Sequence, residues 1–170
     1  AIPVSNMNLA GAKKIKRYIA KNYMTIKYKI NKLEVIKDQS DMNYNKLTSE
    51  QERVIIHKAT EAPFTGEYDD FYEDGTFICR RCNAPLFTSK SKFNAGCGWP
   101  SFDETLPNAV RRIPDPDGMR TEIECNNCGG HLGHEFLDEG LTDKNTRECV
   151  NSLSICFVPK DKGLPRIRNE

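Results

Sequence analysis

Two pairs of cysteines, each with two residues between its members, constrain this chain more than any other feature. Cys79 and Cys82 form the first pair, and Cys125 and Cys128 form the second, far along the chain. Both thiolates of a C-x-x-C turn can reach one ion, and four sulfurs at about 2.3 Å complete the closed shell of a structural zinc site. The spacing therefore predicts one zinc ion that holds two distant segments together.

Two other uses of these cysteines are weaker. A redox C-x-x-C usually opens a helix in a βαβ context, whereas here there are two pairs with strand-like flanks. A disulfide framework is disfavoured because seven is an odd number of cysteines. In addition, a chain of 170 residues is not a small secreted domain that depends on disulfides for its stability. The four zinc candidates leave three further thiols, Cys97, Cys149 and Cys156.

Short apolar segments separated by Gly, Pro, Asn and Asp make up most of the chain after Gly66. They are GTFICRRC, APLFTS, NAVRRIP, GMRTEIEC, HLGHEF and VNSLSICFVP, and many short strands indicate a mainly β domain. Ahead of them, Thr48 or Ser49 with Glu52 predicts the start of a short helix that continues to about residue 58.

Charge divides the chain into unlike parts. Residues 1–45 are rich in Lys and Arg, and we interpret them as a solvated extension or linker, although a targeting role stays open. Alternating apolar residues from Met24 to Ile30 favour a short strand there. Residues 46–160 are expected to form the functional domain, and residues 161–170 a polar, frayed tail.

The overall composition narrows the partners and the compartment. A formal net charge of +1 argues against whole-protein attraction to nucleic acid or to an anionic membrane. No apolar run approaches the length of a transmembrane helix. Because a tetrathiolate zinc site favours reducing conditions, we expect a cytoplasmic protein.

The motif RECVNS suggests a reactive cysteine. Arg147 and Asn151 lie two residues before and after Cys149, so on a strand all three share one face. A fixed positive charge favours the thiolate, and the amide offers a neutral donor, although a structural cysteine beside a surface arginine fits this spacing equally well. His131 and His134 would be surplus as metal ligands, which makes one or both candidate proton donors near neutral pH.

Several long motifs occur in a fixed order. After KLTSEQERVIIHKATEAPFTGEY come GTFICRRCNAPLF, FNAGCGWPSF, RTEIECNNCGGHLGHEF and RECVNS with FVP beyond it. Together they resemble the type B methionine sulfoxide reductases over roughly residues 46–160. The resemblance implies two small antiparallel sheets, a β-tent of the Mss4-like kind, clipped by one structural zinc and preceded by short helices. It also implies repair of oxidised methionine by thiol-dependent reduction of the R epimer of methionine sulfoxide, free or protein-bound, without an organic cofactor.

The resemblance assigns roles to matching positions. Cys149 occupies the position of the nucleophile, and Cys97 that of the resolving cysteine, which would close a disulfide that thioredoxin reduces. Trp99 corresponds to the aromatic residue that holds the methyl group of the substrate. Four further residues match polar positions of the site: His131, His134, Arg147 and Asn151. The zinc-binding subset of the family matches Cys79, Cys82, Cys125 and Cys128, and we expect a monomer.

Some positions depart from this pattern or are not explained by it. Glu135 and Glu148 stand where an apolar residue and a Tyr or His, respectively, are more usual in the family. Their negative charges would raise the pKa of a nearby cysteine. Both alternate with site residues and are expected to point away from the site. Cys156 follows Cys149 at an odd separation, so on one regular strand it would face the opposite side and pack as a small hydrophobe, with a secondary redox role by relay through Cys97 as the alternative. The alternative to an enzyme is a zinc-stabilised module that binds protein or RNA, with Cys97 and Cys149 merely buried.

Overall fold

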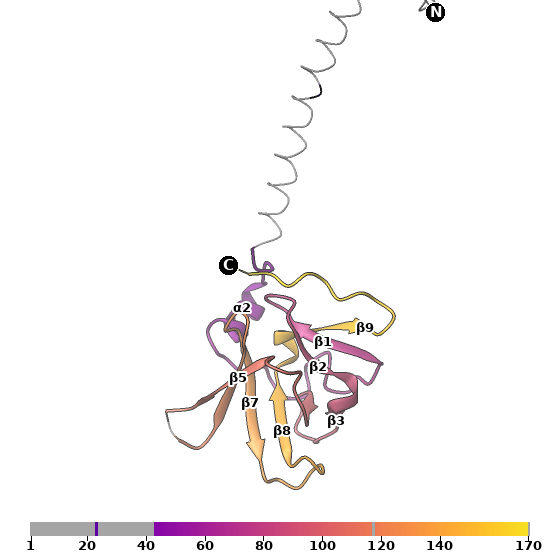
Figure 1. Ribbon diagram of the computed structural model, residues 1–170. Coiled ribbons are helices and arrows are strands. Elements are labelled where there is room, and N and C mark those ends of the chain that lie inside the picture. The colour runs from indigo at the N-terminus through magenta and orange to yellow at the C-terminus, as the bar shows by residue number, and fades with distance from the viewer. Residues whose placement is uncertain (1–22, 24–42, 117, 170) are drawn as a thin grey trace, which may run out of the picture. The chain divides into compact units, whose positions relative to one another are not determined.

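The computed structural model describes residues 23, 43–116 and 118–169, of which 43–169 belong to one compact unit. Within residues 43–116 and 118–169 one short α-helix, α2 (Ser49–Ile55), precedes nine strands (Figure 1). The strand expected from Met24 to Ile30, and nearly all of the basic extension, lie outside the described residues. No helix in the described part has the length and apolar character needed to cross a membrane.

The strands form two antiparallel sheets, which confirms the predicted fold class. The smaller sheet has the order β2-β1-β9 and the larger one the order β3-β4-β8-β7-β6-β5. The smaller sheet contains β1 (Gly75–Cys79), β2 (Pro85–Thr88) and β9 (Ile155–Pro159). The larger contains β3 (Lys92–Phe93), β4 (Ser101–Phe102), β5 (Val110–Pro114), β6 (Thr121–Cys125), β7 (His131–Leu137) and β8 (Thr146–Val150).

Helix α2 begins where the sequence predicts but with a different capping partner. The Thr48 hydroxyl accepts a hydrogen bond from the Gln51 amide, and the Gln51 side chain accepts one from the Thr48 amide. Gln51, not Glu52, is therefore the third helical residue that a capping box requires. The helix ends at Ile55 and not near residue 58, where Lys58 adopts a left-handed φ of 57° that no α-helix contains.

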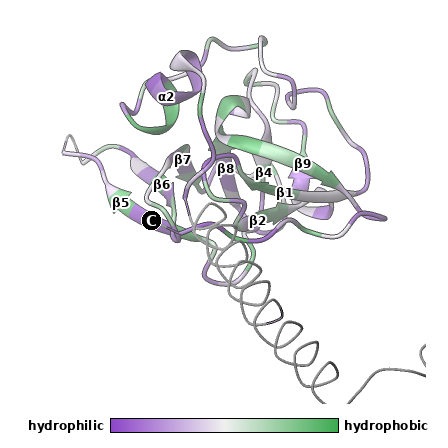
Figure 2. Ribbon diagram, turned by 90° about the horizontal axis from the view of Figure 1, so that it is seen from above, coloured by the Kyte–Doolittle hydropathy of each residue, from purple (hydrophilic) through white to green (hydrophobic). Residues whose placement is uncertain are grey.

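Aromatic side chains join the two sheets. Phe77 on β1 and Phe87 on β2 are fully buried, as is Phe102 on β4 of the larger sheet. Phe87 stacks on Phe102 with ring centroids 4.3 Å apart, and Phe77 meets Phe102 edge-on at 5.1 Å. Such pairs add to the free energy gained from burial alone. Hydrophobic colouring in Figure 2 runs along β4 and β9, in line with a core between the sheets.

The segment VNSLSICFVP is not one continuous strand. A short 3-10 helix, η3 (Ser152–Ser154), interrupts it and carries the chain from β8 of the larger sheet to β9 of the smaller one. Cys149 lies opposite His134, whereas Cys156 lies opposite Ile78 on β1. The two cysteines therefore belong to different sheets, and the expectation that they face opposite sides of one strand is wrong. Burial raises the pKa of Cys156.

The C-terminal segment was expected to be frayed, but hydrogen bonds attach it to the rest of the domain. The Arg168 amide donates to the carbonyl of Cys82 at 2.8 Å. The side chain of Asn83 donates to the Arg166 carbonyl, and that of Asn127 to the Arg168 carbonyl, both at 2.9 Å. The segment thus contacts the turns of both cysteine pairs.

Candidate active site

The two cysteine pairs meet at one point. Their four sulfurs all lie within 4.8 Å of one another, and three of the four residues are buried. Cys79 Sγ lies 3.6 Å from Cys128 Sγ, and Cys82 Sγ lies 3.5 Å from Cys125 Sγ. A tetrahedron with bonds of about 2.3 Å has edges of about 3.8 Å, so the four thiols fit a closed zinc site. We call these four residues the tetracysteine cluster.

Matching turns explain how the cluster forms. The Asn83 amide donates to the Cys79 carbonyl, and the Gly129 amide to the Cys125 carbonyl, each at 2.8 Å. Both closing residues adopt left-handed φ angles, 64° at Asn83 and 70° at Gly129, a conformation that Asn and Gly tolerate best. Each pair therefore turns its two sulfurs to the same side, directly after a strand ends.

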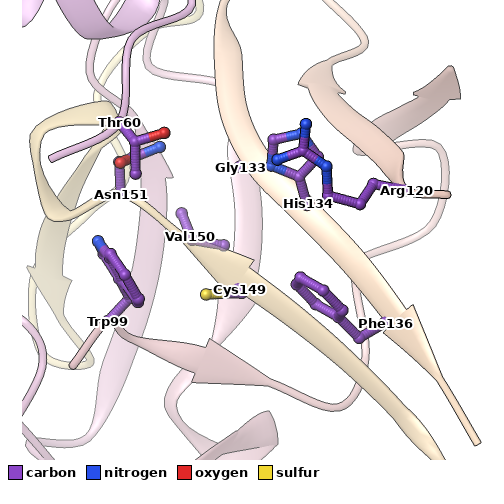
Figure 3. Close-up of a pocket in the computed structure, with 9 residues that line it drawn as sticks. All are labelled: Thr60, Trp99, Arg120, Gly133, His134, Phe136, Cys149, Val150 and Asn151. Carbon is purple, nitrogen blue, oxygen red and sulfur yellow. The ribbon is translucent and has the colours of Figure 1, made fainter. Parts of the chain in front are cut away.

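A separate cavity of about 160 Å³ lies beside β7 and β8 (Figure 3). It is lined by Thr60, Trp99, Arg120, Gly133, His134, Phe136, Cys149, Val150 and Asn151. In Figure 3 the Cys149 side chain lies between those of Trp99 and Phe136. Of the residues predicted from the sequence, Trp99, His134, Cys149 and Asn151 line this cavity. Gly133 allows β7 to lie close to β8 at Cys149, because a Cβ at this position would collide with the Cys149 carbonyl oxygen.

Cys97 and Cys149 lie close enough to interact. Their sulfurs are 4.0 Å apart, and Cys97 stands between Gly96 and Gly98, whose φ angles of 64° and 88° are left-handed. The hydrogen bond from the Cys149 thiol lowers the pKa of Cys97 to about 5, helped by Ser101 and by the charge of Arg147. The same bond raises the pKa of Cys149. The two thiols therefore titrate as a coupled pair, in which the hydrogen bond favours the thiolate at Cys97 and the thiol at Cys149.

The two histidines have different places. His134 lines the cavity, with Nε2 3.4 Å from Asp115 Oδ2. His131 is buried outside the cavity lining, its Nδ1 lies 2.6 Å from Glu122 Oε1, and burial lowers its pKa. The two rings meet edge-on with centroids 5.6 Å apart. His134 can thus reach a bound molecule, whereas His131 packs against His134.

Arg147 and Asn151 support the cavity. The Arg147 guanidinium lies 4.2 Å from the ring centroid of Phe136 and donates two hydrogen bonds to Glu139, at 2.7 and 2.9 Å. The Asn151 amide donates to the Leu132 carbonyl at 3.0 Å, and its Oδ1 accepts from a backbone amide at 2.9 Å. Arg147 does not line the cavity. Asn151 was expected to offer a hydrogen-bond donor to the substrate. Its side-chain oxygen and nitrogen both bind backbone groups instead, which holds the Asn151 side chain in place at the cavity.

Five lining residues were not predicted. Phe136 lies two residues after His134 in the HLGHEF motif, so strand alternation could have suggested it. Gly133 and Val150 directly adjoin His134 and Cys149, and alternation would have placed them on the opposite face. Thr60 and Arg120 come from segments far from the cysteines in sequence. Only the tertiary structure brings these last two to the cavity.

Glu135 and Glu148 point away from the cavity, as their alternation with the site residues predicts. They lie opposite each other on β7 and β8, and both accept hydrogen bonds from Arg112. Glu148 is fully buried, and its Oε2 has no hydrogen-bond partner among the described residues. Burial, together with the nearby Glu135 carboxylate, raises the pKa of Glu148 to about 7.

Glu148 should make stability depend on pH. Its pKa is about 7 in the folded protein against 4.5 for an ordinary glutamate, so its contribution is complete below about pH 4.5 and is lost as the pH rises through 7. Between pH 5 and pH 8 the free energy of unfolding of the wild type should fall by up to about 3 kcal/mol more than that of Glu148→Gln, because the glutamine cannot ionise. Urea unfolding of both proteins at each pH measures this, and parallel pH dependences would contradict it.

Comparison with known proteins agrees with this arrangement. Residues 47–159 match the SelR domain family. Peptide methionine sulfoxide reductase B5 of Oryza sativa subsp. japonica is 53% identical over 125 residues, which cover 72% of this chain and 92% of that protein. Peptide methionine sulfoxide reductase MsrB of Variovorax paradoxus is 54% identical over 110 residues, 63% of this chain and 80% of its own length. The chain therefore belongs to the peptide methionine sulfoxide reductase B family and is an oxidoreductase that reduces methionine sulfoxide.

Proposed function

We propose that this protein reduces the R epimer of methionine sulfoxide, free or within a polypeptide, with Cys149 as the nucleophile. The observation that carries this proposal is the position of the Cys149 side chain between Trp99 and Phe136 in the cavity. Two aromatic rings suit the methyl group and the thioether carbons of the substrate. Cys97 does not line the cavity, so Cys149 is the sulfur that a bound sulfoxide meets.

The first step transfers oxygen from the substrate to the enzyme. Transfer of the Cys149 proton to Cys97 within the coupled pair gives the attacking thiolate. Its sulfur attacks the sulfoxide sulfur and forms a transient S–S bond, while His134 supplies a proton to the sulfoxide oxygen. The protonated oxygen then moves to the Cys149 sulfur, as the S–O bond of the substrate and the transient S–S bond both break. The products are the thioether of methionine and a sulfenic acid on Cys149. The substrate gains two electrons and the cysteine loses two.

The second step closes a disulfide. The Cys97 sulfur attacks the Cys149 sulfenic acid, a sulfur–sulfur bond forms, and water leaves. The sulfurs must approach from 4.0 Å to about 2.0 Å, and the flanking glycines give the Cys97 backbone freedom for this movement. An external dithiol, thioredoxin in our proposal, then reduces the disulfide. All residues used come from one chain, so a monomer suffices.

The tetracysteine cluster would hold one structural zinc ion. Four thiolates leave no open coordination position, so the ion would supply a closed clamp between the ends of β1 and β6 and take no part in the reaction. Because the four cysteines of the cluster form no disulfide, they also favour a reducing compartment such as the cytoplasm.

An assay with separated epimers tests this function. The purified protein with dithiothreitol should convert the R epimer of methionine sulfoxide to methionine and leave the S epimer unchanged, as followed by chromatography. A binding module without catalysis would convert neither epimer. Absence of turnover, or equal turnover of both epimers, would overturn the proposal.

A further inference from the structure

Glu61 connects both sides of the cavity although it is absent from its lining. It follows Thr60, which lines the cavity, and the residue is only 7% exposed. We propose that Glu61 is a positioning residue for the reduction, which fixes Trp99 and Asn151 at the correct distance from Cys149. This inference rests on the proposed function, because it assumes that the substrate binds beside Trp99.

The backbone of Glu61 binds two side chains of the site. Its amide donates to Asn151 Oδ1 at 2.9 Å, and its carbonyl accepts from Trp99 Nε1 at 3.0 Å. Trp99 follows Cys97 by two residues, and Asn151 follows Cys149 by two residues. The backbone of Glu61 therefore holds one side chain near each of the two redox cysteines, Trp99 near Cys97 and Asn151 near Cys149.

The carboxylate of Glu61 anchors that segment. Oε2 accepts a hydrogen bond at 3.3 Å from the amide of Leu153 in η3, the turn that directly follows Asn151. Gly66 packs against the same turn, since a Cβ there would collide with Ser152 Oγ. Burial of a carboxylate is costly unless its hydrogen bonds are satisfied, and here they bind the backbone just beyond the nucleophile's strand.

Figure 3 shows how the side chains that this segment supports lie in the cavity. Thr60 lies next to Asn151, and both stand with Trp99 on one side of Cys149, while Phe136 stands on the other. If the Glu61 carboxylate lost its contact with Leu153, Thr60 and the Trp99 ring would lose their common support. A substrate held by two aromatic walls is sensitive to such displacement, because reaction requires the sulfurs to be aligned at close range.

Substitution of Glu61 tests the inference in the full chain. Glu61→Ala removes the anchor, whereas Glu61→Gln keeps one acceptor for Leu153 and should have an intermediate effect. We expect kcat/KM for an R-sulfoxide peptide to fall about tenfold in the alanine variant, mainly through a higher KM, because a lost hydrogen bond to a charged group has about this effect. Glu67→Gln, at an exposed position in the same segment, is the matched control and should keep wild-type values.

Fluorescence separates positioning from a general loss of structure. Trp99 is the only tryptophan of the chain, so its emission change on substrate binding reports the cavity wall directly. That change should shrink in Glu61→Ala and Glu61→Gln but not in Glu67→Gln. Wild-type KM and emission in a folded Glu61→Gln or Glu61→Ala protein would overturn the inference, whereas an inactive wild type would instead overturn the proposed function.

Discussion

Cys149→Ser is expected to abolish the reduction of methionine sulfoxide, with a loss of about a thousandfold or more. Serine has nearly the size of cysteine, but its hydroxyl does not ionise near neutral pH and cannot accept oxygen as a sulfenic acid. The four residues of the tetracysteine cluster are untouched by this substitution, so the variant should fold. Initial rates with dithiothreitol and with thioredoxin measure the loss.

Cys156→Ser is the matched control. Cys156 lies on β9 of the smaller sheet, and the cavity lining does not include it. This variant should keep close to wild-type turnover with both reductants. Substantial activity in Cys149→Ser would remove Cys149 from its role, and a loss confined to Cys156→Ser would assign the chemistry to the other sheet.

Removal of one metal ligand should produce the largest loss of stability. Cys125 is fully buried at the end of β6, and its sulfur lies 3.5 Å from that of Cys82. Binding energy in a closed zinc site contributes directly to folding. Cys125→Ser should therefore lower the Tm by about 10 °C or more, as measured by circular dichroism together with metal analysis.

The same result should follow from chelation of the wild-type protein. Cys156→Ser serves again as the control, because it removes a partly buried thiol outside the tetracysteine cluster. A wild-type Tm after verified loss of the metal would contradict a structural role for the ion.

Patterns that act over short stretches of sequence were predictable. The C-x-x-C spacing indicates sulfurs that converge, and alternation around Cys149 places Glu148 away from the cavity and Asn151 at it, although Val150 also lines the cavity and Arg147 does not. Both predictions hold because ligand reach and strand alternation depend on neighbouring residues only.

Features that depend on contacts between distant segments were not predictable. η3 interrupts an apolar run that reads as one strand, and the sequence carries no signal that the chain changes sheets there. The tail around Arg168 is polar, yet backbone hydrogen bonds to the cysteine turns hold it. Glu61 was missed for the same reason, because its contacts reach Trp99 and Leu153 far along the chain.

Mass mapping of the thiols after one equivalent of methionine-R-sulfoxide, without a reductant, tests the roles of Cys97 and Cys149 most directly. The wild type should show a single new disulfide between Cys97 and Cys149, with Cys156 still a free thiol. Cys97→Ser should instead accumulate a sulfenic acid on Cys149, which dimedone traps. A disulfide between Cys149 and Cys156, or an unmodified Cys97 in the oxidised wild type, would contradict the assignment of the two redox cysteines.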